Sequence, residues 1–464
     1  MKRCSSLSLG LYVRILFEAV LKRALLRMKE DGVVMIATGV ICGLTCLAMI
    51  IMILWKPQIK WRGIHFDTYP PIAMLGCITL LVSGHLPVSE YIKGLTADTS
   101  VNPLKILVLF FSMTFLSVYL DEAGLFRYLA GVTLKKAGSS QKKLLLFLYL
   151  TVSLLTVFTS NDIVVLTFTP FICYFAKSAD IDPIPYLVTE FVAANTFSMV
   201  FIIGNPTNIY LATSAGLGFL PYAKVMVLPT LAAGTVVWFV LRFLFRKQLS
   251  KSVSTRVELV KFKNRTAIVL GTAHLVVCTS MLVISSYVEL PMWGIAAASA
   301  GSLVITTLIA AKIGCWRPKL IERSIARLPW PLVPFVLSMF ALVLSLNRSG
   351  LSAEIAKRMA GGNSIMVYGI ASVCAANLIN NIPMSVLFST LIPEGGGLGP
   401  VFASIIGSNL GAYLTPIGAL AGIMWMSILK TTGVQYSFGR FTKYGFCVVI
   451  PALAAALLVL GLIL

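Results

Sequence analysis

Apolar segments of about 20 residues, the length with which an α-helix crosses a bilayer, recur along nearly all of the chain after residue 32. Ten spans are predicted, five in each half: 33–55, 69–86, 104–120, 186–212, 222–245, 266–288, 292–311, 331–346, 401–428 and 441–464. Two further apolar segments, 144–177 and 364–392, carry a polar break in the middle and are predicted to be re-entrant hairpins. The pattern therefore predicts an all-α polytopic membrane protein.

Two of the predicted spans are interrupted by polar and helix-breaking residues at matching positions. Asn195 precedes Gly204 by nine residues, and Asn409 precedes Gly418 by the same nine. Gly- and Pro-interrupted apolar segments at corresponding points of two halves are typical of the substrate site of a secondary transporter. We therefore expect two broken helices to line such a site.

Other positions repeat in the same order in both halves. Ser112, Asn161, Asn195 and Pro229 match Ser338, Asn381, Asn409 and Pro451, at offsets of 226, 220, 214 and 222 residues. An odd number of crossings in each copy places the second copy upside down, which is an inverted repeat. The predicted organisation is a tail at 1–31, repeat 1 at 32–246, a basic cytoplasmic linker at 247–265 and repeat 2 at 266–464.

Composition and charge agree with a multi-pass protein of the cytoplasmic membrane. The chain is 58% hydrophobic and only 12% charged. The net charge of +21 does not indicate nucleic-acid binding, because 25 of the 38 basic residues fall in segments that the predicted topology places in the cytoplasm and six fall outside. The remaining seven lie in the tail, which this topology places on the wrong side.

The tail is a basic amphipathic stretch of the kind that lies on an anionic cytoplasmic leaflet. Either it folds back through an undetected crossing, or translation starts at Met28, which directly precedes the first span. We favour the second hypothesis.

Seven of the nine cysteines occur inside apolar runs without metal-site spacing and are predicted to be small buried hydrophobes: Cys42, Cys46, Cys77, Cys173, Cys278, Cys374 and Cys447.

The four breaks predict a solute site at the middle of the membrane, because non-helical backbone survives there only where it lines a cavity or a site. Half-helices beginning at Asn161, Asn381, Pro206 and Pro416 would direct their positive ends inward, which favours an anion or a polar neutral solute. Unwound carbonyl groups at the opposing ends could instead hold a cation.

Three titratable residues allow alternative interpretations. Asp162 is the only acid at a hairpin tip, where it would either bind a coupling proton or cation or cap the following helix. Glu190 is expected to be an interfacial residue, with a vestibule acid as the alternative. His274 is expected to be hydrogen-bonded or to face water. The adjacent amides of Asn380 and Asn381 favour a binding site over a simple helix cap.

At these residues the sequence resembles the ion transporter superfamily, and within it the ArsB/NhaD-type arsenite permeases and citrate-transporter-like proteins. The resemblance rests on residues 160–170, 204–208, 380–383 and 414–421 and covers nearly all of the chain after Met28. It implies elevator-like movement of a transport domain and a homodimer. The repeat and the resemblance together give the candidate substrate and ion site: Ser160, Asn161, Asp162, Asn195, Gly204, Asn205, Thr207, Asn208, Asn380, Asn381, Ser408, Asn409, Thr415 and Gly418.

One departure from the family pattern bears on the substrate. Sodium-coupled dicarboxylate carriers of this superfamily have a Ser-Asn-Thr sequence at both hairpin tips, whereas here Asp162 and Ile382 occupy the third positions. The resemblance therefore favours export of a small oxyanion or metalloid such as arsenite or antimonite, driven by protons. A Na+/H+ antiporter or a citrate and dicarboxylate transporter is the alternative, and a channel is a remote one.

The remaining expectations concern cofactors and partners. Three scattered histidines supply no catalytic or metal site, so we expect neither an enzyme nor a resident cofactor, with H+ or Na+ as the coupling ion. The sequence contains no P-loop, which indicates that this chain hydrolyses no ATP itself. An arsenical ATPase partner is compatible with the resemblance.

Overall fold

The computed structural model describes residues 32–53, 55–56, 58–61, 64–98, 102–250, 264–288, 290–314, 319–359, 363–393 and 397–464. The predicted tail at 1–31, which includes the proposed translation start at Met28, lies outside the described residues. So does most of the basic linker at 247–265.

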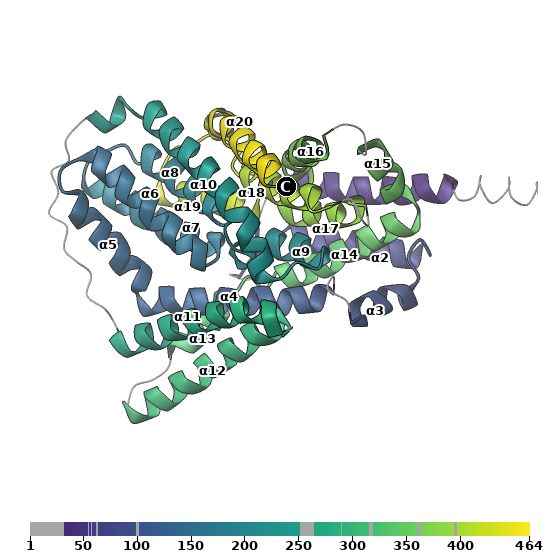
Figure 1. The fold of residues 1–464 in the computed structure, drawn as a ribbon, viewed down its shortest axis with the longest axis horizontal. Helices are drawn as coiled ribbons and strands as arrows, with labels where there is room; N and C mark the ends of the chain where they lie inside the picture. Colours follow the sequence, from purple (N-terminus) through teal and green to yellow (C-terminus); the bar gives the residue numbers. More distant parts are fainter. Residues whose placement is uncertain are drawn as a thin grey trace, which may run out of the picture.

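The first half begins with the helix Gly32–Ile53 and a short hairpin of strands β1 (Gln58–Trp61) and β2 (Ile64–Asp67), in which Gln58 pairs with Asp67. Its helices are α2 (Tyr69–Val82), α3 (Val88–Thr96), α4 (Pro103–Ala123), α5 (Leu125–Ala137), α6 (Gln141–Phe158), α7 (Asn161–Ser178), α8 (Ile184–Phe197), η1 (Ile202–Gly204), α9 (Pro206–Ser214), α10 (Phe219–Leu244) and η2 (Gln248–Ser250) (Figure 1).

The second half contains helices in the same order of long, short and broken. They are α11 (Arg265–Val288), α12 (Met292–Ile313), α13 (Lys319–Ala326), α14 (Leu332–Arg348), α15 (Leu351–Met359), α16 (Ser364–Ile379), α17 (Asn381–Leu391), α18 (Gly399–Gly411), α19 (Leu420–Thr432) and α20 (Phe438–Ile463). The all-helical class predicted from the sequence is thus confirmed, apart from the small β-hairpin.

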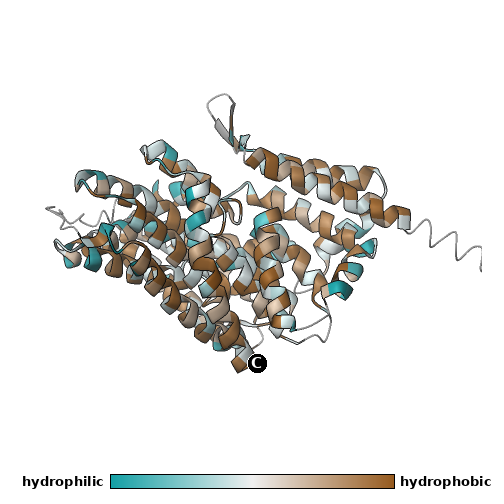
Figure 2. Cartoon of the chain, turned by 90° about the horizontal axis from the view of Figure 1, so that it is seen from above, coloured by the Kyte–Doolittle hydropathy of each residue, from teal (hydrophilic) through white to brown (hydrophobic). Residues whose placement is uncertain are grey.

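Seven helices among the described residues are long and apolar enough to cross a membrane. They include α6, which the sequence analysis assigns to a hairpin arm, whereas α2 has only 14 residues and falls short of the predicted span. The helices α14 and α15 would count as an eighth span, but they bend by 79° at Ser349–Gly350. Hydrophobic residues cover most of the long helices (Figure 2), and outward side chains such as Leu462 and Ile313 are 87% and 79% exposed. A surface of this kind is suited to lipid.

Four short helices, α3, α5, α13 and α15, are missing from the predicted set. Each follows a long helix or a loop and carries charged residues, so a search for long apolar segments does not detect it.

The prediction that the seven cysteines are buried is partly wrong. Cys42, Cys77, Cys173 and Cys278 are buried and Cys46 is half-buried, but Cys374 and Cys447 are exposed on apolar helix surfaces.

The helices are interrupted at the polar residues that predicted the interruptions. The helix α6 ends at Phe158 and α7 begins at Asn161, and α16 ends at Ile379 two residues before α17 begins. The segments predicted as broken helices divide into α8 and α9, and into α18 and α19. The helix α9 begins at Pro206 as predicted, but the predicted start at Pro416 is wrong, because the chain continues in turns to Ala419 and α19 begins at Leu420. In both cases the chain leaves helical geometry between the two arms.

The packing of the two halves is reciprocal. The helix α4 packs on α12, and its counterpart α14 packs on α2; α7 packs on α19, and α17 packs on α9. The helices α10 and α20 lie against one another and join the two halves. In these contacts a pair formed by one helix of each half is matched by a second pair in which the halves are exchanged.

One ion-pair cluster connects α4 to the segment after α13. A single Arg327 nitrogen lies 2.7 Å from an oxygen of Asp121 and 2.6 Å from an oxygen of Glu122. Asp121 is 2% exposed, and its other carboxylate oxygen has no hydrogen-bond partner. On α14, which holds the place of α4 in the second half, Arg348 pairs with Glu90 of α3. The long helix α4 thus carries the acids of its ion pairs, whereas α14 carries the base.

We expect Arg327→Gln to destabilise the protein, because the substitution leaves the carboxylate of Asp121 buried without a counter-ion. Breaking a fully buried pair costs about 3–5 kcal/mol; since the Arg327 side chain is 34% exposed, we expect roughly half of that. Thermal unfolding in detergent measures the effect. The control is Arg358→Gln, whose pair with Glu354 is exposed and which should change stability by less than about 0.5 kcal/mol. Equal effects would contradict the argument.

Candidate functional site

A buried cluster of asparagines connects the break between α8 and α9 to α18 of the second half. The Asn409 side chain of α18 accepts hydrogen bonds from Ser198 at 2.9 Å and from Asn205 at 3.0 Å. Its amide nitrogen donates to Asn208 at 2.7 Å and to the Ile405 carbonyl group at 2.8 Å. All four side chains are 2% exposed or less. Asn409 of the second half thus connects three residues of the break between α8 and α9 in the first half.

The first hairpin is fastened to this cluster through Asn161. Its amide nitrogen donates to the Asn195 side-chain oxygen at 3.1 Å. The Asn195 amide nitrogen donates in turn to the Phe191 carbonyl group at 2.8 Å, which fixes the orientation of Asn195. The predicted site residue Asn205 is the N-cap of α9, and its side-chain oxygen accepts from the Thr207 backbone and hydroxyl groups, both at 3.1 Å.

The second hairpin is fastened to the break between α18 and α19. The Asn380 amide nitrogen donates to the Ile417 carbonyl group at 2.9 Å, and the Asn381 backbone N–H donates to the Gly418 carbonyl group at 3.1 Å. Asn380 has a φ of 73°, a left-handed conformation that asparagine tolerates better than most residues. Its backbone can therefore turn sharply between α16 and α17.

Sequence reasoning missed two residues that complete these connections, Ser198 and Asn377. The Asn377 oxygen accepts from the Thr415 hydroxyl group at 2.6 Å, and its nitrogen donates to the Gly411 carbonyl group at 2.9 Å. Thr415 is therefore engaged by a residue of α16. Asn377 is the amide three positions before Asn380, within an apolar helix, and that isolated polarity is the signal that could have identified it.

Four buried polar atoms at the predicted site have no hydrogen-bond partner. They are the side-chain oxygens of Ser160, Asn161, Asn381 and Ser408. Asn161 and Asn381 occupy matching positions in the two halves, each as the first residue of the second hairpin arm. An unsatisfied buried acceptor costs about 1–3 kcal/mol, so a solute that donates hydrogen bonds would be stabilised at these oxygens.

Asp162 lies in the first turn of α7 and is half-buried. The helix N-terminus is positive, so a carboxylate is favoured in this turn. Ser160 occupies the N-cap position but its side chain makes no capping hydrogen bond. Asp162 thus lies beside the unpartnered oxygens, where either predicted role is geometrically available.

Two predicted site residues, Gly204 and Gly418, allow the backbone to approach itself closely. A Cβ atom on Gly204 would lie 2.3 Å from the Ser198 carbonyl oxygen, and one on Gly418 would lie 2.6 Å from the Gly411 carbonyl oxygen. Both breaks fold back on the preceding helix at the glycine nine residues after the asparagine. The matching spacing in the two halves therefore has a steric cause.

The expectation that Glu190 is interfacial is wrong. The residue is fully buried on α8, within hydrogen-bond distance of Thr169 on α7 and Trp425 on α19. The expectation for His274 is confirmed, since its ring nitrogen lies 2.8 Å from the Leu270 carbonyl group of its own helix. Sequence position along α8 could not show that α19 covers the Glu190 carboxyl group.

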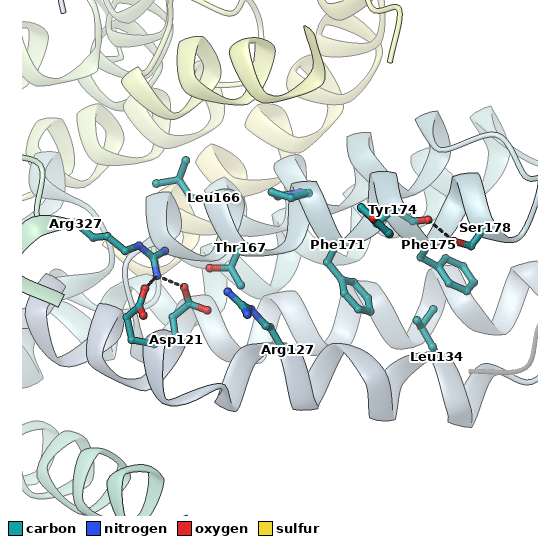
Figure 3. Close-up of a pocket in the computed structure, with 12 residues that line it drawn as sticks. Asp121, Arg127, Leu134, Leu166, Thr167, Phe171, Tyr174, Phe175, Ser178 and Arg327 are labelled. Atoms are coloured by element: carbon teal, nitrogen blue, oxygen red, sulfur yellow. Dashed lines mark hydrogen bonds and ion pairs between the residues drawn. The ribbon is translucent and has the colours of Figure 1, made fainter. Parts of the chain in front are cut away.

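Two cavities flank the second arms of the hairpins. One of about 770 Å³ lies between α7 and the helices α4 and α5, with Arg127 and the Arg327 ion pairs at its polar end and Phe171 on its apolar wall (Figure 3). The other, of about 970 Å³, lies between α17 and the helices α14 and α15. They occupy equivalent places in the two halves. Within the described ranges, no group of His, Cys, Asp and Glu side chains could hold a metal ion.

Comparison with known proteins gives consistent relationships. The sequence model of the citrate transporter family, CitMHS, matches residues 50–400. An arsenical pump membrane protein of Escherichia coli is 24% identical over 449 residues, covering 91% of this chain and 98% of the relative. One from Escherichia coli strain K12 is 26% identical and covers 92% and 99%. A 46 kDa membrane protein of Mycobacterium leprae is 24% identical over 76% of this chain and 84% of the relative.

Among solved structures, the YdaH transporter of Alcanivorax borkumensis matches with a TM-score of 0.56. The match covers 92% of this chain and 98% of that one at 14% sequence identity. At this identity the likeness shows the fold alone.

We expect Gly204→Ala to destabilise the protein by about 1–3 kcal/mol or more, because the added methyl group must displace backbone that closes the break. The matched control is Gly301→Ala in α12, where no heavy atom lies within 4 Å of the added carbon; alanine should stabilise that helix by about 0.5–1 kcal/mol. Unfolding temperatures of the two purified variants make the comparison. A Gly204→Ala protein as stable as the control would contradict the close approach.

Proposed function

The chain belongs to the citrate transporter family, and from this premise we propose that it is a secondary transporter that moves a small hydroxylated metalloid, arsenite or antimonite, across the cytoplasmic membrane. Family membership makes it a multi-pass membrane transporter and not an enzyme. The names of the arsenical pump relatives support the choice of cargo.

The observation that carries the choice is the chemistry of the unpartnered atoms. They are two amide oxygens and two hydroxyl groups, and the predicted site contains no lysine or arginine. Turning the Asn161 amide over would not satisfy its oxygen, because its nitrogen would then lose the hydrogen bond to the Asn195 oxygen. Neutral arsenite carries O–H donors for these oxygens. A citrate polyanion would need cations that this set does not supply.

We further propose that the two halves form an inverted repeat and that the hairpins and broken helices move together as an elevator. The matching order of helices and the reciprocal packing of α4 on α12 and α14 on α2 support the repeat. The cavities behind α7 and α17 leave space beside both hairpins. Asp162, the acid at the hairpin tip, would bind the coupling proton. A homodimer and an arsenical ATPase partner belong to the same proposal.

The test is transport by purified protein in proteoliposomes under an imposed pH gradient, with arsenite, antimonite, citrate and Na+ as separate solutes. We expect gradient-driven arsenite movement, reduced about tenfold or more by Asp162→Asn because the amide cannot exchange a proton. Movement of citrate or Na+ alone would contradict the metalloid cargo. Unchanged transport by Asp162→Asn would assign Asp162 to helix capping.

A second variant tests the oxygen contacts of the same site. We expect Asn381→Ala to raise the KM for arsenite about tenfold, the cost of about 1.4 kcal/mol for one lost hydrogen bond, with less effect on the maximal rate. The control is Asn363→Ala at the exposed start of α16, which only caps that helix. A KM that is the same for both variants would exclude Asn381 from the site.

A further inference from the structure

The carboxyl group of Glu190 is fully buried and is not used by the asparagine cluster. Three elements that flank the site converge on it: α8 carries it, α7 contributes Thr169, and α19 contributes Trp425. It lies five residues before Asn195 on α8, which is about 7.5 Å along the helix. A protonation change at Glu190 is therefore adjacent to the helices that hold the solute site.

Counting protons at this position shows a shortage of donors for a carboxylate. The Thr169 hydroxyl group has one proton and three acceptors within reach, the Val165 carbonyl oxygen at 2.6 Å and the two Glu190 oxygens at 3.2 Å each. The shortest contact assigns that proton to Val165. The Trp425 N–H, 3.3 Å from one Glu190 oxygen, is then the remaining donor.

A protonated Glu190 resolves the shortage. Its O–H donates to the Thr169 oxygen while Thr169 donates to Val165, and Trp425 donates to the carbonyl oxygen of the acid. If the proton leaves to a water molecule, Thr169 can rotate its own proton from Val165 to the carboxylate that remains. The hydroxyl group thus has two arrangements, one for each protonation state.

The surroundings of Glu190 are otherwise apolar or aromatic. Phe191 and Phe441 pack against Trp425, and Cys173 of α7 is buried and lies within hydrogen-bond distance of the Thr432 hydroxyl group of α19. The tyrosines beside Trp425 are Tyr413, Tyr436 and Tyr444. The basic residues of the helices α6, α7, α10, α19 and α20, which surround this region, are exposed: Lys142, Lys143, Lys177, Lys224, Arg242, Lys430, Arg440 and Lys443. Among the described residues, then, no cation pairs with Glu190.

The equivalent position in the second half shows that packing does not require an acid here. At the offset of 214 residues that relates Asn195 to Asn409, Glu190 corresponds to Ser404. Ser404 is also fully buried, and its hydroxyl group donates to the Pro400 carbonyl group at 2.7 Å. A small residue whose hydroxyl group bonds to its own helix thus occupies this position on α18. The acid on α8 is therefore not required for packing, which indicates another role for it.

We propose that Glu190 is a proton-binding site that couples proton movement to solute movement, in addition to the acid at the hairpin tip. This inference rests on the proposed proton-coupled transport. The helix α7, which carries Thr169, also lines the 770 Å³ cavity with Thr167 and Pro170, so water in this cavity can approach α7; Thr167 is labelled in Figure 3. Pro170 has no N–H and leaves the Leu166 carbonyl group without its usual helical donor, which gives water an acceptor within the helix.

The experiment compares wild type with Glu190→Gln in proteoliposomes of the full chain, using arsenite and citrate as separate probes. The isosteric amide keeps hydrogen bonds to Thr169 and Trp425. Exchange of labelled solute at equal pH should be retained within about twofold, while accumulation driven by a pH gradient should fall about tenfold or more. Gradient-driven accumulation equal to wild type would overturn the inference. Absence of transport of every solute by wild type would instead refute the proposed function.

A second measurement does not depend on transport. Infrared difference spectra of the purified protein, recorded across a pH titration, should contain a protonated-carboxyl band that is missing in Glu190→Gln. The band should persist in Asp162→Asn and in the control Glu354→Gln, whose carboxyl group is exposed and paired with Arg358. An unchanged band in Glu190→Gln would show that Glu190 carries no proton and overturn the inference even if that variant folds poorly in liposomes.

Discussion

Wherever a helix stops inside an apolar environment, its last carbonyl groups and first N–H groups lose their partners, and each must find another or raise the energy of the fold. This chain stops helices four times near its centre, and asparagine is its main solution. An asparagine side chain both donates and accepts, so one residue can satisfy two groups of opposite kind. Asn409 does so for the break between α8 and α9, and Asn377 does so for the break between α18 and α19.

The same constraint explains why the site is a property of the assembled halves. The cluster at Asn409 takes its partners from residues about 200 positions earlier in the chain. The side-chain oxygens of Asn161 and Asn381 are buried and have no hydrogen-bond partner. The amide nitrogen of Asn161 thus holds the fold, whereas its oxygen has no partner and is the atom that the proposed function assigns to the solute.

The sequence was sufficient to predict the helical class and the points where the helices break, because those features depend on local apolar length and on Asn, Gly and Pro at matching offsets. It could not place α5 or α15, whose charged faces resemble loops. It also misplaced Glu190, since the burial of that acid depends on Trp425, 235 residues away. Asn377 was missed for a related reason: its partners, Gly411 and Thr415, belong to another broken helix. Contacts between distant segments are set by packing, which the local pattern does not encode.

The distribution of acids separates the two functions that a coupled carrier must combine. Two of the amides repeat, Asn161 and Asn195 as Asn381 and Asn409, so the proposed solute site has a matching part in each half. The acids do not repeat, because Asp162 and Glu190 correspond to Ile382 and Ser404. In the proposed mechanism, a protonation change at Glu190 would act on α8 and α7, and on α19 of the second half through Trp425. Since Thr169 and Asn161 both lie on α7, this helix would connect the change to the proposed solute site, while the matching positions of the second half carry no acid.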